Sequence, residues 1–262
     1  MIPIALTAAG SDPSGGAGIQ ADLKTFSRLK VYGMSVVTAL TAQNTTGVAG
    51  VFEISADFVG LQWDAVMNDI APTAIKTGML GSPAIVEVVA SKIQESRVAK
   101  VVVDPVLKSS TGTPLLHKDA LRYLKHGLAP LALLITPNLE EAAALVGFEV
   151  QSPRDMEEAA LRIRDMGPKN VLVKGGHLDS ADAPDVLFDG RTMHYLRAPR
   201  LERVHLHGTG CVLSAAITAF LALGFPLEES VRLAKNFVTE SIRNSLAVGK
   251  GRRPCNPAGV AG

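Results

Sequence analysis

The sequence predicts an α/β fold with a mostly parallel central sheet, helices on both faces of the sheet, and a β-hairpin at one edge. Short β-branched runs alternate with longer helical patterns along almost the whole chain. Several of these runs are continuously apolar, as is typical of strands that helices cover on both faces. The alternation of strands and helices favours parallel strands joined by helical crossovers.

The expected strands are Ile4–Ala8, Ser35–Leu40, Thr73–Thr77, Val101–Val103, Leu131–Thr136 and Asn170–Val173. The expected helices are Ile19–Leu29, Ala56–Asp69, Ser82–Gln94, Lys118–Leu124, Leu139–Leu145, Arg154–Met166, Val212–Leu223 and Leu227–Ala247. Segment Val186–Arg197 instead alternates, and it contains Asp189-Gly190, a pair favoured in tight hairpins. Because no repeat or long polar linker interrupts the chain, we expect one domain over residues 1–262, with 249–262 as a C-terminal tail.

The composition excludes several classes of protein. Apolar residues make up 47% of the chain and charged residues 19%, which is ample for a large core. Lys and Arg total 26 against 25 Asp and Glu, so no overall basic field attracts nucleic acid or an anionic membrane. Two cysteines are too few for a disulfide framework, and neither a signal peptide nor a membrane-length apolar segment is evident. We expect a soluble, cytoplasmic protein.

Two glycine-rich loops each precede an expected helix. The loop from Gly10 to Gly18 lacks the Gly-Lys-Ser/Thr of a P-loop, and either a binding loop or a tight turn accounts for it. In the second loop, Gly208-Thr209-Gly210 lead into Cys211 at a helix N-terminus, which suits a phosphoryl group in transfer. That position predicts a lowered thiol pKa for Cys211. The alternative is that Cys211 is a small core residue.

Polar residues follow three of the expected strands, and the carboxyl ends of parallel strands share one edge of the sheet. Asp104 and Glu141 are candidate ligands of hydrated Mg²⁺, and Lys174 is a candidate partner of a phosphate. A structural interpretation also exists, in which Asn138 and Glu141 form a helix capping box and Asp104 forms a turn. The presence of all of them at one edge favours a site.

The same residues resemble a known family, the hydroxymethylpyrimidine/phosphomethylpyrimidine kinases of thiamine biosynthesis. The resemblance lies in segments 9–26, Thr38–Thr45, Lys76–Leu80, Asp104–Val106, Thr136–Ala142, Lys174–His177 and His207–Cys211. It extends to about Ala247. The opening segment together with the cysteine-containing loop is uncommon outside this family.

The resemblance implies a ribokinase-like fold, a homodimer, and Mg²⁺- and ATP-dependent phosphorylation of 4-amino-5-hydroxymethyl-2-methylpyrimidine and then of its monophosphate. It implies a pyrimidine pocket lined by Gly10, Asp22, Gln43, Met79 and Val106. Asp22 and Gln43 would pair with a ring nitrogen and the exocyclic amine, for which a carboxylate and an amide have suitable groups. It further implies an anion hole at Gly208, Thr209 and Gly210, Cys211 as catalytic base, metal-positioning roles for Asp104, Asn138 and Glu141, and ATP contacts by Lys174, Thr209 and Asn138.

Three segments depart from the family pattern: His205-Leu206, the loop Leu107–Thr113, and Gly249–Pro254, whose basic residues we expect in a solvated tail. Two alternative functions remain open. Pyridoxine or pyridoxal kinase activity is one, because those substrates are also aromatic nitrogen rings with a hydroxymethyl group. A non-catalytic sensor of vitamin precursors is the other, although a sensor has no need of the full set of phosphoryl-transfer residues.

Overall fold

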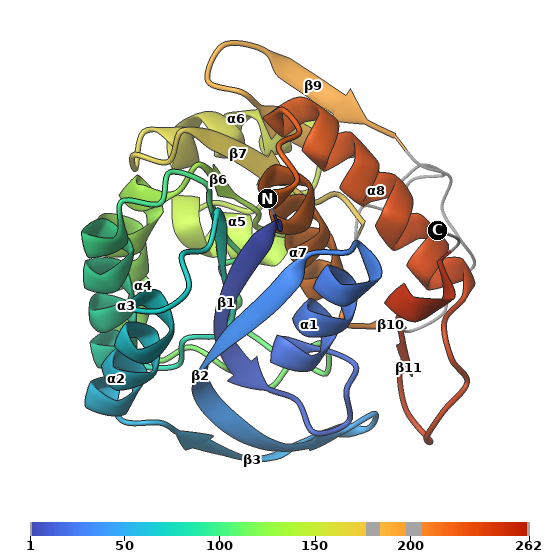
Figure 1. The fold of residues 1–262 in the computed structure, drawn as a ribbon. Helices are drawn as coiled ribbons and strands as arrows, with labels where there is room; N and C mark the ends of the chain where they lie inside the picture. Colours follow the sequence, from blue (N-terminus) through green and yellow to red (C-terminus); the bar gives the residue numbers. More distant parts are fainter. Residues whose placement is uncertain (1, 177–183, 198–205, 261–262) are drawn as a thin grey trace.

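The computed structural model describes residues 2–176, 184–197 and 206–260, so His177 and His205 lie outside the described residues. In this described part of the chain, one sheet has the strand order β3-β2-β1-β4-β5-β6-β7-β8-β9 (Figure 1). Strands β2, β1, β4, β5, β6 and β7 are parallel, whereas β3, β8 and β9 pair antiparallel to their neighbours. The predicted α/β class, the mostly parallel sheet and the edge hairpin are therefore confirmed.

The strands of this sheet are β1 Ile4–Ser11, β2 Tyr32–Asn44, β3 Gly47–Glu53, β4 Ala74–Thr77, β5 Val101–Val103, β6 Leu134–Ile135, β7 Asn170–Val173, β8 Asp185–Phe188 and β9 Met193–Leu196. A separate parallel pair is formed by β10 Leu206–His207 and β11 Arg253–Pro254. The α-helices are α1 Gly18–Arg28, α2 Ala56–Met67, α3 Pro83–Ser96, α4 Ala120–Tyr123, α5 Leu139–Val146, α6 Pro153–Arg164, α7 Thr209–Ala222 and α8 Leu227–Arg243.

Helices cover both faces of the sheet. Helices α2 to α6 pack on one face, where Trp63 and Ile163 belong to the larger core cluster (Figure 1). Helices α1, α7 and α8 pack on the other face, where Ile217 and Phe237 belong to a second cluster. Both faces are thereby removed from water, which explains the continuously apolar strands. Within the described residues, no helix is both long enough and apolar enough to cross a membrane.

The largest difference from the expected strands is at one edge of the sheet. Strand β2 is longer than the predicted Ser35–Leu40, and it pairs antiparallel with β3, which the sequence pattern did not predict. Most of β3 is exposed or only half-buried. A strand without one buried face lacks the alternation of apolar and polar residues by which strands are predicted.

Two other expected elements are shorter in the structure. The expected strand Leu131–Thr136 is reduced to β6, because a 3₁₀ turn that contains Pro130 occupies Ala129–Leu131. The expected helix Lys118–Leu124 has one α-helical turn, α4, and then continues as a π-helical turn over Leu124–Leu128.

Part of the C-terminal segment is packed against the rest of the chain, whereas the basic residues Lys250 and Arg253 are exposed, as expected of a solvated tail. Arg253 and Pro254 pair with β10, and the side chain of Cys255 is buried. The Arg28 guanidinium on α1 donates to the carbonyl oxygen of Val260, with Nε at 2.8 Å. Hydrogen bonds to β10 and to α1 hold this segment in place. The composition of the segment gave no indication of these contacts.

Helix α6 provides a test of the packing, because it carries two large aliphatic residues in contrasting environments. Ile163 is fully buried, whereas Leu161 is 44% exposed. We expect Ile163→Ala to lower the free energy of unfolding by about 2–5 kcal/mol, because it leaves a cavity in the core. Leu161→Ala, the matched control, should change it by less than about 0.5 kcal/mol. Chemical denaturation measures both, and equal losses would contradict this assignment of the buried face.

Candidate active site

A cavity of about 600 Å³ lies at the carboxyl ends of the parallel strands. This is the edge at which open α/β sheets bind ligands. Of the residues predicted for the site, the following line it: Gly10, Gln43, Met79, Asp104, Val106, Asn138, Glu141, Lys174, Gly208, Thr209, Gly210 and Cys211. The structure therefore brings together residues that lie as far apart in the sequence as Gly10 and Cys211.

Asp104 follows β5 and is almost fully buried at the base of the cavity. Its Oδ1 accepts a hydrogen bond from Lys174 Nζ at 2.9 Å, and its Oδ2 accepts one from Ser214 Oγ at 3.0 Å. Burial alone would raise the pKa of Asp104, but the nearby ammonium groups of Lys174 and Lys76 lower it below its usual value. Burial would lower the pKa of Lys174, but Asp104 and Glu141 raise it. Both groups are therefore charged at neutral pH.

Glu141 serves two structural purposes at once. Its Oε2 accepts a hydrogen bond from Asn138 N at 2.7 Å, while Asn138 Oδ1 accepts one from Glu141 N at 2.9 Å. This is the capping box at the start of α5 that the sequence pattern allowed. The same Oε2 lies 3.7 Å from Lys174 Nζ. Burial raises the pKa of Glu141 to about 7, and Lys174 opposes this rise.

The cysteine-containing loop forms the first turn of α7, which begins earlier than predicted, at Thr209. The first helical hydrogen bond runs from Val212 N to Gly208 O, so the N–H groups of residues 209–211 have no acceptor within the helix. Gly208 has a φ of 83°, and a Cβ there would lie 1.8 Å from the carbonyl oxygen of Gly16. Only glycine fits this close approach of the two loops.

The pKa of Cys211 is raised, which corrects the prediction of an acidic thiol. Burial is the largest effect, and it raises the pKa of Cys211 to about 11. Lys76 and the N–H of Gly18 oppose the rise, whereas the carboxylates of Asp22 and Asp104 add to it. The sequence revealed the helix N-terminus, which stabilises a thiolate, but not the buried carboxylates around it.

Asp22 does not line the cavity, contrary to the prediction. Its side chain on α1 is fully buried and accepts hydrogen bonds from Thr7 Oγ1 at 2.7 Å and from Lys76 Nζ at 2.8 Å. Burial raises the pKa of Asp22, and Lys76 opposes this rise. Lys76, which does reach the cavity, was assigned no role from the sequence. A lysine inside the expected buried strand Thr73–Thr77 was the signal that could have identified it.

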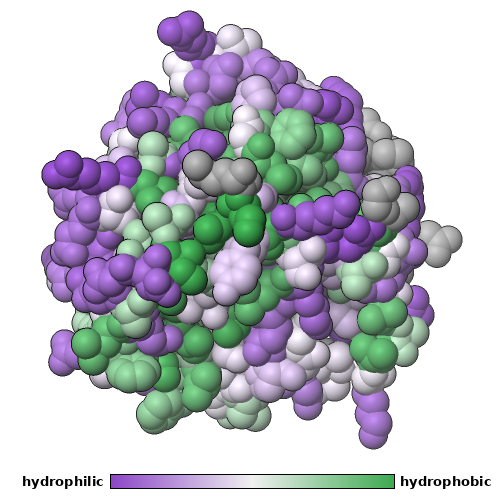
Figure 2. All heavy atoms as spheres, in the orientation of Figure 1, coloured by the Kyte–Doolittle hydropathy of each residue, from purple (hydrophilic) through white to green (hydrophobic). Residues whose placement is uncertain are grey.

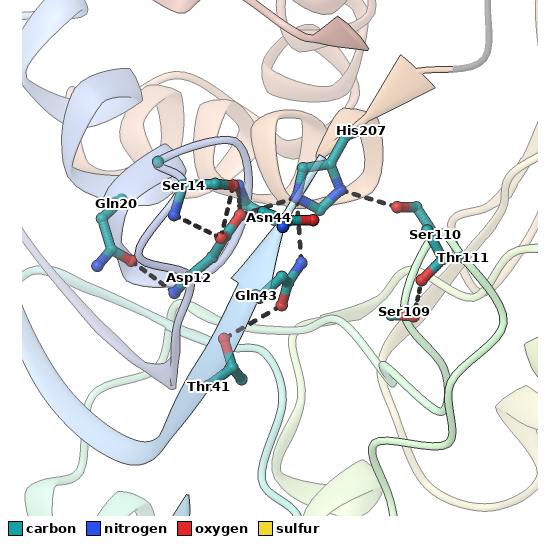
Figure 3. Close-up of polar contacts among 12 residues, drawn as sticks. Asp12, Ser14, Gln20, Thr41, Gln43, Asn44, Ser109, Ser110, Thr111 and His207 are labelled. Carbon is teal, nitrogen blue, oxygen red and sulfur yellow. Dashed lines mark hydrogen bonds and ion pairs between the residues drawn. The ribbon is translucent and has the colours of Figure 1, made fainter. Parts of the chain in front are cut away.

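A second polar network, which the sequence did not predict, links Asp12 of the first glycine-rich loop to His207 and Ser110 (Figure 3). His207 at the end of β10 contacts Asp12 Oδ2 through Nε2 at 2.8 Å, and Ser110 Oγ through Nδ1 at 2.8 Å. The His207 ring is almost fully buried, and a Cβ on Gly16 would lie 2.5 Å from its Cδ2 atom. Gln43, predicted to bind the pyrimidine, contacts the same ring (Figure 3).

Comparison with known protein sequences gives one consistent family. Residues 12–256 match the phosphomethylpyrimidine kinase family. The chain is 44% identical to a hydroxymethylpyrimidine/phosphomethylpyrimidine kinase of Bacillus subtilis, over 96% of this chain and 93% of that protein. It is 47% identical to the thiamine biosynthesis bifunctional protein ThiED of Geobacter sulfurreducens, over 96% of this chain. It spans about half of that bifunctional relative, 51% of its length.

Known structures agree with this assignment. A phosphomethylpyrimidine kinase of Clostridium difficile superposes with a TM-score of 0.82 and 43% identity, over 92% of this chain and 100% of that one. An ADP complex of Bacillus subtilis pyridoxal kinase superposes with a TM-score of 0.91 and 39% identity, over 99% and 98% of the two chains. By its sequence, its fold and the residues that line its cavity, this chain belongs to the phosphomethylpyrimidine kinase family.

Proposed function

We propose that this chain is a kinase that uses ATP to phosphorylate 4-amino-5-hydroxymethyl-2-methylpyrimidine and then converts the monophosphate to the diphosphate, in thiamine biosynthesis. The observation that carries the proposal is one cavity lined both by Gln43 and by the residues at the N-terminus of α7. A hydroxymethylpyrimidine needs both ends, because its ring must be recognised while its hydroxyl group reaches a phosphate. The relatives named for this activity support the same conclusion.

The pyrimidine end of the proposed site contains an amide and apolar walls. Gln43 has both a donor and an acceptor, which an aminopyrimidine edge requires. Gly10 and Met79 pack closely, since a Cβ on Gly10 would lie 2.9 Å from Met79 Sδ. Together with Val106 they offer the apolar surface that a planar ring needs.

At the phosphate end, we assign the N–H groups at the start of α7 to the transferring phosphoryl group and Lys174 to the ATP phosphates. Free N–H groups at a helix N-terminus stabilise an anion through the helix dipole. A Cβ on Gly210 would lie only 3.3 Å from Lys174 Nζ, so the two sources of positive charge are adjacent. Thr209 and Asn138 complete the proposed ATP contacts. Pyridoxal kinase structures with AMP-PCP and with ADP superpose on this chain with TM-scores of 0.91 and 0.92.

The cavity also fits a bound Mg²⁺, which we propose as cofactor. Mg²⁺ keeps several waters and takes one or two carboxylates together with substrate phosphates. Asp104 and Glu141 are two such carboxylates, and the described residues contain no cluster of three or more His, Cys, Asp or Glu that could hold a metal. When bound, the metal would neutralise charge on the phosphate groups. Asp104, Asn138 and Glu141 would hold it and its waters.

We assign Cys211 as the base toward the hydroxymethyl group, with a constraint from its raised pKa. The thiol is protonated in the free protein at neutral pH, because the pKa is about 11. A base must have lost its own proton before it can accept another, so Cys211 must ionise once the ligands have bound. Lys76 and Lys174 already favour the thiolate in the free protein, so the additional shift must come from the bound ligands.

A second candidate function is pyridoxal kinase activity. Pyridoxal kinases of Bacillus subtilis and Staphylococcus aureus superpose closely on this chain, and one Staphylococcus aureus structure contains pyridoxal. The curated relatives described above favour the pyrimidine. The buried ion pair of Asp104 and Lys174, with Glu141 beside it, argues against a sensor without catalysis, because burying charges costs free energy and a sensor has no need of them.

We also propose that two copies form a homodimer in the cytoplasm. Strand β3 is an edge strand, and large apolar side chains near it are exposed, with Phe52 at 68%, Phe58 at 54% and Leu61 at 62%. Figure 2 shows hydrophobic atoms gathered at the lower left, where Figure 1 has α2 and β3. Gathered apolar surface of this kind is typical of protein–protein interfaces, and an uncovered edge strand can pair with a second chain.

The proposed activity is tested by measuring ATP consumption with hydroxymethylpyrimidine and, side by side, with pyridoxal. We expect turnover of the pyrimidine in two successive phosphorylations and a lower kcat/KM for pyridoxal. Cys211→Ala should lower turnover about a hundredfold or more while leaving pyrimidine binding almost unchanged. A higher kcat/KM for pyridoxal would select the second candidate, and no ATP consumption with either substrate would refute both.

The raised pKa of Cys211 predicts how its alkylation depends on pH. Only the thiolate reacts with iodoacetamide, and at pH 8 about one thiol in a thousand is ionised when the pKa is about 11. The alkylation rate of Cys211 in the ligand-free protein should therefore keep rising from pH 8 to pH 10, followed by mass spectrometry of the peptide. A plateau below pH 8 would instead mean that the helix N-terminus outweighs burial.

The metal assignment predicts an altered magnesium requirement in Glu141→Gln. Glutamine can still cap α5 but is a weaker ligand of Mg²⁺, so more Mg²⁺ should be needed for half-maximal rate, with little change in pyrimidine affinity. Glu158→Gln is the matched control, since Glu158 is exposed on α6 and pairs with Arg162. Rate is measured against free Mg²⁺ for all three proteins. Superimposable curves for wild type and Glu141→Gln would refute the metal assignment.

A further inference from the structure

His207 lies against Gln43, and the hydrogen bonds around the two side chains determine how each must be oriented. All four acceptor positions of the Asp12 carboxylate are used. Oδ1 accepts from the N–H and the hydroxyl of Ser14, at 2.9 and 2.7 Å, and Oδ2 accepts from Ala17 N at 2.8 Å and faces His207 Nε2 at 2.8 Å. Burial would raise the pKa of Asp12, but hydrogen bonds from His207 and Ser14 lower it. Asp12 is therefore an ionised, purely accepting group.

Because Asp12 can only accept, the hydrogen between the two groups must be on His207 Nε2. This holds whichever group supplies the hydrogen between His207 Nδ1 and Ser110 Oγ on the other side of the ring. A nitrogen that donates to Asp12 cannot also accept a hydrogen bond. The group that Gln43 presents to His207 Nε2 must therefore be an acceptor as well.

Thr41 is compatible with the same orientation at the other end of the Gln43 amide. Its Oγ1 has one hydrogen and lies 2.9 Å from the carbonyl oxygen of Ser11 and 3.2 Å from the Gln43 amide, and either group can accept that hydrogen. When the hydrogen goes to Ser11, Thr41 Oγ1 can accept a hydrogen bond from the amide. With Nε2 toward His207 at 3.2 Å, the contact between Gln43 and His207 brings two donors together (Figure 3). With the amide turned over, Oε1 shares the Nε2–H of His207 with Asp12, and Nε2 donates to Thr41.

We propose that His207 is a positioning residue, whose Nε2–H, held by Asp12, fixes the orientation of the Gln43 amide that recognises the substrate ring. This inference rests on the proposed function, in which Gln43 binds the pyrimidine. One lone pair of Oε1 and one N–H of Nε2 are left for the ligand, with the acceptor on the His207 side. The exocyclic amine of an aminopyrimidine would then lie toward His207 and the accepting ring nitrogen toward Thr41.

Without His207, the Gln43 amide has no reason to keep this orientation, and the reversed amide offers the ligand a donor where it needs an acceptor. An unpaired buried polar group reduces affinity by about tenfold to a hundredfold. We expect His207→Leu to raise the KM for hydroxymethylpyrimidine by about tenfold or more, with the KM for ATP and kcat changed less than about threefold. His207→Gln should restore part of the loss, because its side-chain amide can donate to Asp12.

His194 offers a matched control. Its Nε2 lies 2.8 Å from Asp189 Oδ2, the same distance as in the His207–Asp12 pair, but it belongs to β9 at the far edge of the sheet. His194→Leu should leave both KM values unchanged. Calorimetric titration of each variant with the pyrimidine in the absence of ATP separates binding from turnover, and circular dichroism melting shows that each variant folds.

The ring nitrogen of His207 that carries the hydrogen can be identified in the wild-type protein. The proposal can therefore be tested even if His207→Leu does not fold. In ¹⁵N NMR of histidine-labelled protein, with His207 assigned from the His207→Gln spectrum, we expect a hydrogen on Nε2. A ring with Nε2 unprotonated would overturn the inference, as would an unchanged pyrimidine KM in folded His207→Leu. A wild type that does not phosphorylate the pyrimidine at all would instead refute the proposed function.

Discussion

The cavity depends on keeping opposite charges paired beneath it in a nearly dry environment. Asp104 is 2% exposed, and its carboxylate is held by Lys174 together with the hydroxyl groups of Ser214 and Thr136. Removing one partner of such a buried pair leaves the other uncompensated, at a cost of about 3–5 kcal/mol. Strand β5, strand β7 and helix α7 each contribute to this group, so their relative positions are fixed by the requirement for neutralisation. A phosphate ligand therefore meets a site whose cationic group is already in place.

A second buried pair, Lys76 with Asp22, shapes the chemistry of the thiol beside it. Lys76 favours ionisation of Cys211, whereas burial and the two nearby carboxylates oppose it, and burial is the largest of these effects. The thiol is consequently held neutral until the charges around it change. An anion bound beside the thiol would oppose its ionisation and a bound cation would favour it, so the ligands of the proposed site would determine the reactivity of the proposed base.

Most of the sheet could be predicted, and most of the residues predicted for the site line one cavity, because both follow from local patterns: apolar runs mark buried strands, and polar residues directly after them share one edge. The remainder depends on contacts across long separations. Asp22 sits on a helix face whose burial the sequence does not specify, and its lysine partner is 54 residues away. The Asp12–His207 pair spans 195 residues. Arg253 and Pro254 become a strand only because β10 is there to pair with, and nothing in their own composition predicts it.

The pairing of β10 with β11 fixes the position of His207 relative to the start of α7. His207, the proposed positioning residue for Gln43, is followed directly by Gly208, which precedes the N–H groups of the first turn of α7. A displacement of β10 would therefore move the ring-recognising group and the anion-binding turn together. Strand β11 holds β10 on one side, with Cys255 N donating to the carbonyl oxygen of His207 at 3.1 Å. On the other side, Gly16 leaves room for the imidazole to lie against the first glycine-rich loop. In the proposed site, the spacing between the ring-binding amide and the phosphate-binding turn would therefore be set within one short segment, from His207 at the end of β10 to Thr209 at the start of α7.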